Sequence, residues 1–148
     1  MGPGHGPTDA LRDMITSQDI IKTAREYLGT PFHHQGRVKG VGVDCGGLAI
    51  CVARDLGLPY VDVQGYSRTP SGGAFIRYLT ASFDRVHVIE DGCILLMTFS
   101  KEPQHVAIYT GNDAIIHSYF GVRKVTEHRL DGVWHSRITA IFKFRGIE

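Results

Sequence analysis

Cys45 is the residue whose type and position best suit nucleophilic chemistry. It follows a glycine-containing loop, at the point in residues 43–48 (VDCGGL) where an apolar helical pattern begins. A helix start offers free backbone N–H groups and a positive dipole end, which favour a thiolate and can hold an oxyanion. Gly46 and Gly47 remove bulk beside the sulfur, whereas Asp44 can cap the helix but opposes thiolate formation by its charge. We therefore predict that Cys45 is a nucleophile and that Gly46 helps to form the oxyanion site.

The other two cysteines lack this context. Cys51 falls on the apolar stripe of the same helix, and Cys93 opens an apolar strand, so we expect both to be structural. An isolated cysteine is most often a small buried residue, and that remains the plain alternative for Cys45 as well. Three cysteines without a CxxC pair make a poor disulfide framework and a poor zinc site, which favours synthesis in a reducing compartment.

A thiol nucleophile needs a base that can later protonate the leaving amine. The chain has eight histidines, and His105 and His117 are distinguished by their position. Both lie in alternating, strand-like segments that are joined by a hairpin signal, Gly-Asn-Asp, at residues 111–113. Such a hairpin would place both side chains near the same end of the sheet. We predict that His105 is the base and that His117 orients it, although each could instead be an ordinary surface or core histidine.

Elements on both sides of these residues must position them. The expected helices begin at Thr16 or Ser17, at Asp44-Cys45 and at Ala74, and end near residues 28, 55 and 82; the expected strands cover residues 86–88, 93–99, 105–110, 114–119, 122–126 and 138–144. Helices followed by antiparallel strands predict an α+β fold. The loop 30–43 is either a connector or a rim around a site. For the loop 60–74, a surface connector is favoured over a wall of the cleft.

Length and composition limit the possible functions. The chain has 148 residues, is 43% hydrophobic and carries a net charge of +1, which are values of a globular protein without the excess of basic residues that nucleic-acid binding needs. We expect one domain over residues 14–148, preceded by a disordered arm or expression remnant over residues 1–13. No apolar run is long enough to cross a membrane, and residues 1–13 lack the apolar core of a signal peptide. Synthesis in the cytoplasm is therefore expected.

Four segments together resemble the NlpC-type family of cell-wall cysteine peptidases: GTPF at 29–32, VDCGGL at 43–48, QHVAIYTG at 104–111 and IH at 116–117. The resemblance covers residues 17–145 and implies a circularly permuted papain-like fold, with helices packed on a C-terminal antiparallel sheet. It also implies Cys45 as nucleophile, His105 as base and His117 as orienting residue, without metal or cofactor. The implied substrate is a peptidoglycan stem peptide, cut at the γ-D-glutamyl–diaminopimelate bond or a related bond at the cell wall.

The sequence departs from this family pattern at several points. Gly46 stands where the family commonly has serine, and Phe32 or His34 where it commonly has a tyrosine near the active site. We expect Phe32 and His34 to contact substrate. The segments at residues 29–36 and 42–47 look closest to the phage-tail and gene-transfer-agent branch. That likeness implies phage tail proteins as candidate partners, and action from a virion or tail particle.

Three other interpretations remain open. The same residues could transfer an acyl group to an amine, as a transglutaminase or acyltransferase does, if the site excludes water. The chain could also be a tail-assembly protein that keeps the fold without using its catalysis. A metal site built from His33, His34 and Cys45 is disfavoured, because the sequence has neither an HExxH motif nor a Cys/His pair pattern.

Overall fold

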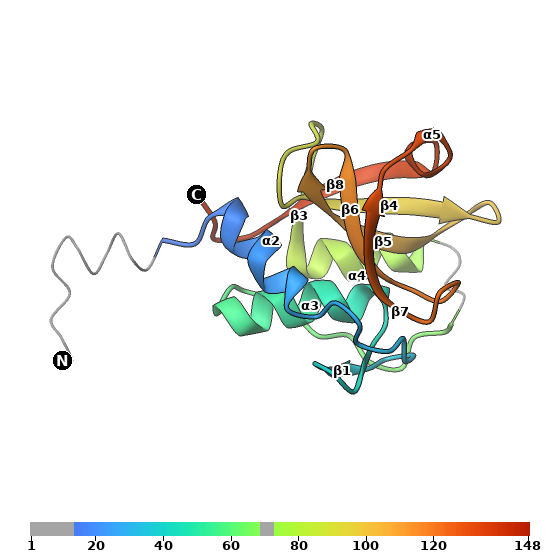
Figure 1. Ribbon diagram of the computed structural model, residues 1–148, viewed down its shortest axis with the longest axis horizontal. Coiled ribbons are helices and arrows are strands. Elements are labelled where there is room, and N and C mark those ends of the chain that lie inside the picture. The colour runs from blue at the N-terminus through green and yellow to red at the C-terminus, as the bar shows by residue number, and fades with distance from the viewer. Residues whose placement is uncertain (1–13, 69–72) are drawn as a thin grey trace, which may run out of the picture.

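The architecture is that of a computed structural model, which describes residues 14–68 and 73–148. The arm expected over residues 1–13 lies outside the described residues, as does the part of the loop 60–74 at residues 69–72. Figure 1 shows the longer helices gathered on one side of a curved sheet. The order of helices first and antiparallel strands afterwards confirms the α+β prediction.

Each of the three helices begins where the sequence predicts. Helix α2 covers Ser17–Arg25, α3 covers Cys45–Leu56 and α4 covers Ala74–Ser82. Thr16 caps α2 in a reciprocal capping box with Asp19, which satisfies two free backbone N–H groups at that end. Helix α3 is buried over residues 47–53, in agreement with the nearly continuous apolar sequence of that stretch.

Eight strands and one short helix complete the described chain. They are β1 (Arg37–Val38), β2 (Gly42–Val43), β3 (Phe83–Val86), β4 (Ile94–Phe99), β5 (Glu102–Gly111), β6 (Ala114–Tyr119), β7 (Lys124–Arg129), α5 (Gly132–His135) and β8 (Ile138–Phe144). Strands β1 and β2 pair with each other, so the loop 30–43 contains a small hairpin. The other six strands form one antiparallel sheet in the order β3-β8-β4-β5-β6-β7.

The hairpin between β5 and β6 is present as predicted, with Asn112 and Asp113 at positive φ between the paired residues Gly111 and Ala114. Two expected strands are displaced along the chain, and a third, β5, begins three residues early, at Glu102 rather than at residue 105. The strand expected at residues 86–88 is β3, which lies three residues earlier. It starts at the buried Phe83, which pairs with Phe144, and its last pair joins Val86 to Ile141.

The second displaced strand is the one expected at residues 122–126. It starts two residues later, at Lys124, because residues 120–123 form the turn after β6, with Arg123 at φ 63°. The shift carries β7 on to Arg129. It therefore places His128, which lies outside all of the expected strands, inside a strand.

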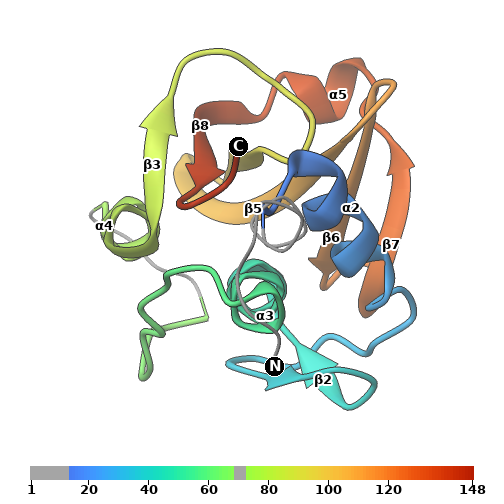
Figure 2. The same cartoon turned by 90° about the vertical axis from the view of Figure 1, so that its left-hand side faces the viewer.

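The sheet separates two apolar clusters. In Figure 2 the strands curve around α3, with β3 beside α4 at one end and β7 on the side of α2. The larger cluster lies between the helices and the sheet face that carries Ile94 and Val106. The smaller one lies on the opposite face, where Leu95, Ala107 and Trp134 pack together. Alternation along the strands thus sends neighbouring residues to different cores.

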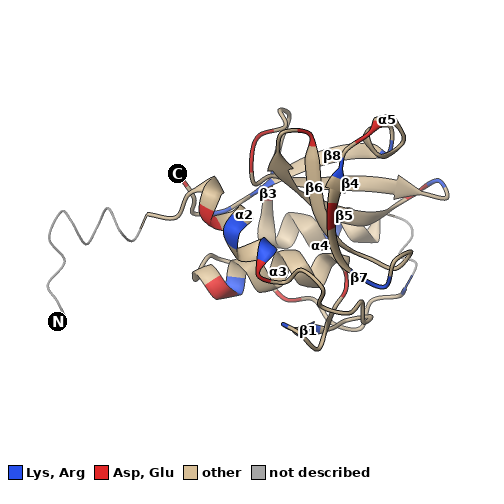
Figure 3. Cartoon of the chain, viewed as in Figure 1, with Lys and Arg blue, Asp and Glu red and all other residues tan. Residues whose placement is uncertain are grey.

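Charged residues of both signs are distributed over the helices, strands and loops in Figure 3, in keeping with a net charge of +1. Within the described ranges, no helix combines the length and the apolar character that crossing a membrane requires.

Candidate active site

Cys45 is the first residue of α3 and opens onto a cavity of about 430 Å³. Asp44 caps the helix by accepting a hydrogen bond from the backbone N–H of Gly47, at 2.7 Å. The Cys45 Sγ lies 4.0 Å from the backbone oxygen of Gln104, the residue before His105, and His105 lines the same cavity. The structure thus brings the start of α3 against β5.

The electrostatics of Cys45 differ from the sequence expectation. Burial, reinforced by the negative charge of Asp44, raises the pKa of the Cys45 thiol to about 12. Backbone N–H groups of Gly46 and Val106 act in the opposite direction but are outweighed. The predicted preference for a thiolate is therefore wrong, because burial raises the thiol pKa by more than the N–H groups of the helix start lower it. The site holds a neutral thiol with N–H groups directed at its sulfur.

Three histidines form a continuous hydrogen-bonded ladder across β5, β6 and β7. His105 Nε2 is 2.6 Å from His117 Nδ1, and His117 Nε2 is 2.8 Å from His128 Nε2. The His105–His117 contact was predicted from the hairpin, whereas His128 was not expected at the site. The strand register explains the ladder. His117 pairs with Thr126, two residues from His128, so the two histidines are diagonal neighbours on one face.

The imidazoles of His105 and His117 are almost completely inaccessible to solvent, at 4% and 0% exposed. Burial lowers the pKa of both rings, and repulsion by the Arg137 guanidinium and by a protonated His128 ring adds to the effect on His105. For His117 the additional repulsion comes from His105 and His128. His105 and His117 are therefore neutral at rest, and each keeps a lone pair on one ring nitrogen.

This burial makes the folded state sensitive to acid. Below pH 6.5, the ordinary histidine pKa, the unfolded chain takes up protons that the folded His105 and His117 refuse, so stability falls as the pH falls. We expect the free energy of unfolding to drop between pH 7 and pH 5 by about 2 kcal/mol for each of the two histidines. Urea unfolding at both pH values measures this. The exposed His135→Gln variant should show the same drop, and a wild type equally stable at pH 5 and pH 7 would contradict the account.

Aromatic side chains enclose the ladder. Tyr119 stacks on His117 with ring centroids 5.2 Å apart and planes 4° from parallel, and Trp134 contacts the rings of His117 and His128 at 5.0 and 5.2 Å. The guanidinium of Arg137 lies 5.0 Å above the centre of the Trp134 ring. This packing fixes the ring planes and keeps water away from the hydrogen bonds between them.

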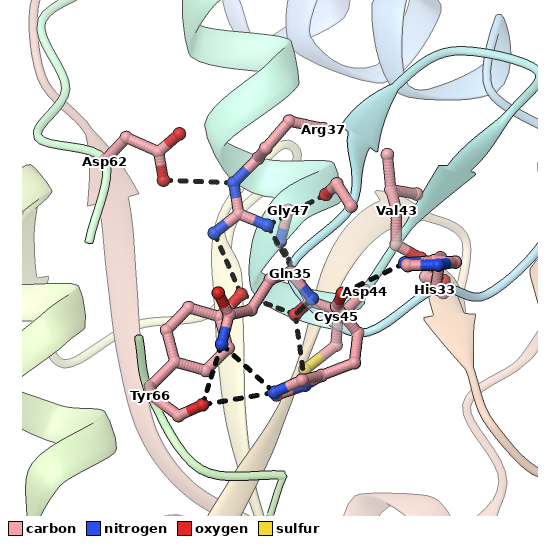
Figure 4. Close-up of polar contacts among 12 residues, drawn as sticks. His33, Gln35, Arg37, Val43, Asp44, Cys45, Gly47, Asp62 and Tyr66 are labelled. Carbon is pink, nitrogen blue, oxygen red and sulfur yellow. Dashed lines mark hydrogen bonds and ion pairs between the residues drawn. The ribbon is translucent and has the colours of Figure 1, made fainter. Parts of the chain in front are cut away.

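A polar network supports the loop on the other side of Cys45 (Figure 4). Asp44 accepts hydrogen bonds from Arg37 Nη1 at 3.1 Å, from the backbone N–H of Gln35 at 2.8 Å and from the hydroxyl of Tyr66. Arg37 also contacts Asp62 at 3.0 Å. Burial and the charge of Asp44 raise the pKa of Tyr66, so its hydroxyl stays protonated and can donate. The network neutralises and immobilises the carboxylate beside the nucleophile.

This network corrects the expectation for the loop 60–74. Tyr66, Ser67 and Arg68 line the cavity, so the described part of this loop is a wall of the cleft rather than a surface connector. His34 Nε2 lies 3.1 Å from the backbone oxygen of Tyr66, and their rings meet edge to face. Tyr66 thus brings a phenol to the cavity beside His34.

The remaining predicted site residues divide into two groups. Phe32, His34 and Gly46 all line the cavity, whereas His117 lies behind His105 in the ladder. Gly47 does not leave room for substrate as expected. A Cβ there would lie 2.4 Å from the backbone oxygen of Gly36, so this glycine instead allows the loop to pack against α3.

The metal site considered from the sequence has no support in the described part of the chain, where no three His, Cys, Asp or Glu side chains converge as ligands. His33 is exposed, and its Nδ1 is occupied by the backbone oxygen of His34 at 3.0 Å.

With this geometry in view, comparison with known proteins is informative. The sequence matches the NlpC/P60 family over residues 29–143, which is most of the chain. The chain belongs to the NlpC/P60 family. The matched region contains α3, the sheet strands and all three histidines of the ladder. The search of curated proteins yields no match.

Solved structures share the NlpC/P60 fold at low sequence identity. An NlpC/P60 family protein from Bacillus cereus superposes with a TM-score of 0.69 at 20% identity, over 88% of this chain and 41% of that one. The NlpC/P60 domain of the peptidoglycan hydrolase SagA gives 0.62 at 21% identity, over 88% of this chain and 100% of that one. The peptidoglycan hydrolase RipB from Mycobacterium tuberculosis gives 0.59 at 20%, over 100% and 74%. The chain therefore spans less than half of the Bacillus cereus protein.

Proposed function

We propose that this NlpC/P60 protein is a cysteine endopeptidase that hydrolyses an amide bond in peptidoglycan stem peptides. The observation that carries the proposal is a thiol at a helix start that shares a cavity with a buried, hydrogen-bonded histidine. A nucleophile beside a base, with a third residue that orients the base, is the arrangement that acyl transfer from an amide uses. Peptidoglycan as substrate is supported by the family and by the names of the SagA and RipB structures.

The neutral state of the site defines the order of proton transfers. His105 takes the proton of the Cys45 thiol as the sulfur attacks the carbonyl carbon of the scissile amide, which forms a tetrahedral intermediate. Its collapse breaks the C–N bond, and the leaving amine receives that proton from His105. Water, deprotonated by the same ring, then hydrolyses the thioester and restores the thiol. No resting thiolate–imidazolium pair is needed, which agrees with the raised pKa of Cys45 and the lowered pKa of His105.

The negative charge of the intermediate falls beside the start of α3. The backbone N–H groups near Cys45 Sγ, among them that of Gly46, are the proposed oxyanion donors. Phe32 and His34 line the same cavity and are proposed to contact the substrate chain. The bond we favour is γ-D-glutamyl–diaminopimelate or a related one, as the resemblance of the sequence motifs implies.

Mass spectrometry of stem peptides and purified wall fragments after incubation with the protein tests this function. We expect a new fragment whose mass identifies a single cleaved amide bond, and no fragment from peptides lacking the γ-glutamyl linkage. Parallel reactions with an added primary amine separate hydrolysis from acyl transfer, since transfer adds the mass of the amine to the product. An amine adduct without hydrolysis would favour the acyltransferase, and no product at all would favour a catalytically unused tail protein.

A phage-tail or prophage wall hydrolase is the setting we propose. It is supported by the likeness of residues 29–36 and 42–47 to that branch of the family. Proteomic detection of the chain in purified tail particles is the expected result, and particles without it would contradict this setting.

A further inference from the structure

His128 ends the histidine ladder and has one hydrogen bond whose direction is certain. Its Nδ1 lies 2.9 Å from the backbone oxygen of Arg129. A carbonyl oxygen only accepts, so Nδ1 of His128 must carry the proton. In the neutral ring, Nε2 of His128 is then a bare acceptor, and it faces Nε2 of His117 at 2.8 Å.

This fixed end determines each of the following bonds. His117 must donate from Nε2 to His128, which leaves its Nδ1 bare to accept from His105. His105 must therefore donate from Nε2, at 2.6 Å, and its lone pair is confined to Nδ1. Which nitrogen of a histidine is protonated depends on the bond that the other nitrogen makes, and here that dependence passes through three rings.

The opposite ladder would be inactive. If every ring were reversed, His105 would carry its proton on Nδ1 and would have no free lone pair for a thiol. The reversed ladder also places a bare Nδ1 of His128 against the Arg129 carbonyl, so that two acceptors face each other. Arg129 and His128 together therefore select the one direction in which His105 can act as a base.

We propose that His128 is a positioning residue that sets the tautomer of His117 and, through it, of His105. The proposal rests on the proposed peptidase function for its catalytic consequence, but the tautomers themselves can be observed without activity. The contacts of Cys45 alone do not determine these tautomers. The tautomers depend on the diagonal placement of residues on β5, β6 and β7.

Two substitutions separate this role from simple packing. In His128→Gln the amide oxygen can occupy the position of Nε2 and still accept from His117, whereas His128→Phe fills the space without an acceptor. We expect His128→Phe to lower kcat on the stem peptide by about tenfold to a hundredfold with KM nearly unchanged. His128→Gln should stay within about threefold of the wild type. His135→Phe, on the exposed surface, is the matched control and should leave kcat unchanged.

Imidazole ¹⁵N NMR gives a readout that a packing role would not move. In the wild type, His105 and His117 should be protonated at Nε2 and His128 at Nδ1, and in His128→Phe the first two should show mixed tautomers. Equal losses of kcat in both variants, with unchanged tautomers, would overturn the proposal, as would the opposite tautomers in the wild type. If the wild type shows the stated tautomers but cleaves no peptide, the proposed function fails and the assignment of His128 stands.

Discussion

Replacing Cys45 with alanine should lower the hydrolysis of stem peptides to the background of the assay, a loss of about 10⁴-fold or more. The covalent route needs sulfur at the start of α3, and no other cysteine opens onto the cavity: Cys51 and Cys93 are both buried. The free energy of unfolding should change by less than about 1 kcal/mol, because the small Cys45 side chain packs only at the edge of the core. Steady-state rates and urea unfolding measure the two effects.

Cys51→Ala is the matched control, since it removes a thiol from the same helix. Cys51 is fully buried, so this variant should lose stability but keep its turnover. Hydrolysis that persists in Cys45→Ala, or that disappears in Cys51→Ala while the protein remains folded, would remove Cys45 from the role of nucleophile.

Replacing His105 with alanine should lower kcat by about 10³–10⁴-fold, and replacing His117 should lower it by only about 10–100-fold. His105 is the ring that shares the cavity with Cys45, so its loss removes the acceptor of the thiol proton. Loss of His117 leaves His105 in place, but the His105 ring is then free to rotate and its Nε2–H has no partner. The measurement is kcat for both variants at one pH near neutrality.

The conservative change His117→Asn makes this comparison sharper. An asparagine oxygen can take the place of Nδ1 and accept from His105 Nε2, so His117→Asn should recover most of the activity lost in His117→Ala. Losses of equal size for His105→Ala and His117→Ala, or a larger loss at His117, would show that the two roles are misassigned.

Local signals in the sequence were sufficient for much of this fold. The Gly-Asn-Asp turn and the alternation on either side of it predicted the β5–β6 hairpin, and with it the contact of His105 with His117. Asp44 before an apolar helical run predicted the start of α3. Each of these signals lies within a few residues of the feature that it predicts.

The parts that the sequence did not predict depend on distant pairings. His128 reaches His117 only because β7 pairs with β6 in a particular register. That register depends on the turn between the two strands, which is two residues longer than the sequence predicts. Tyr66 reaches Asp44 from a loop with no periodic pattern. A turn predicted at Arg123 would have moved the expected start of β7 and placed His128 beside His117. No local signal places Tyr66 beside Asp44.

The thiolate expectation failed for a related reason. The dipole of a helix start can be read from sequence, but the depth at which the surrounding chain buries that start cannot. For Cys45, burial raises the thiol pKa by more than the helix start lowers it.

Trp134 gives the ladder an optical property. It is the single tryptophan of the chain, and its indole contacts the rings of His105, His117 and His128 at 6.2, 5.0 and 5.2 Å. A protonated imidazole in contact with an indole quenches its emission, whereas a neutral one quenches it much less. Red-edge excitation selects tryptophan over tyrosine, so the emission of this protein comes from one chromophore that borders three imidazoles. The fold thus contains an unlabelled fluorescent probe of the protonation state of its own histidines.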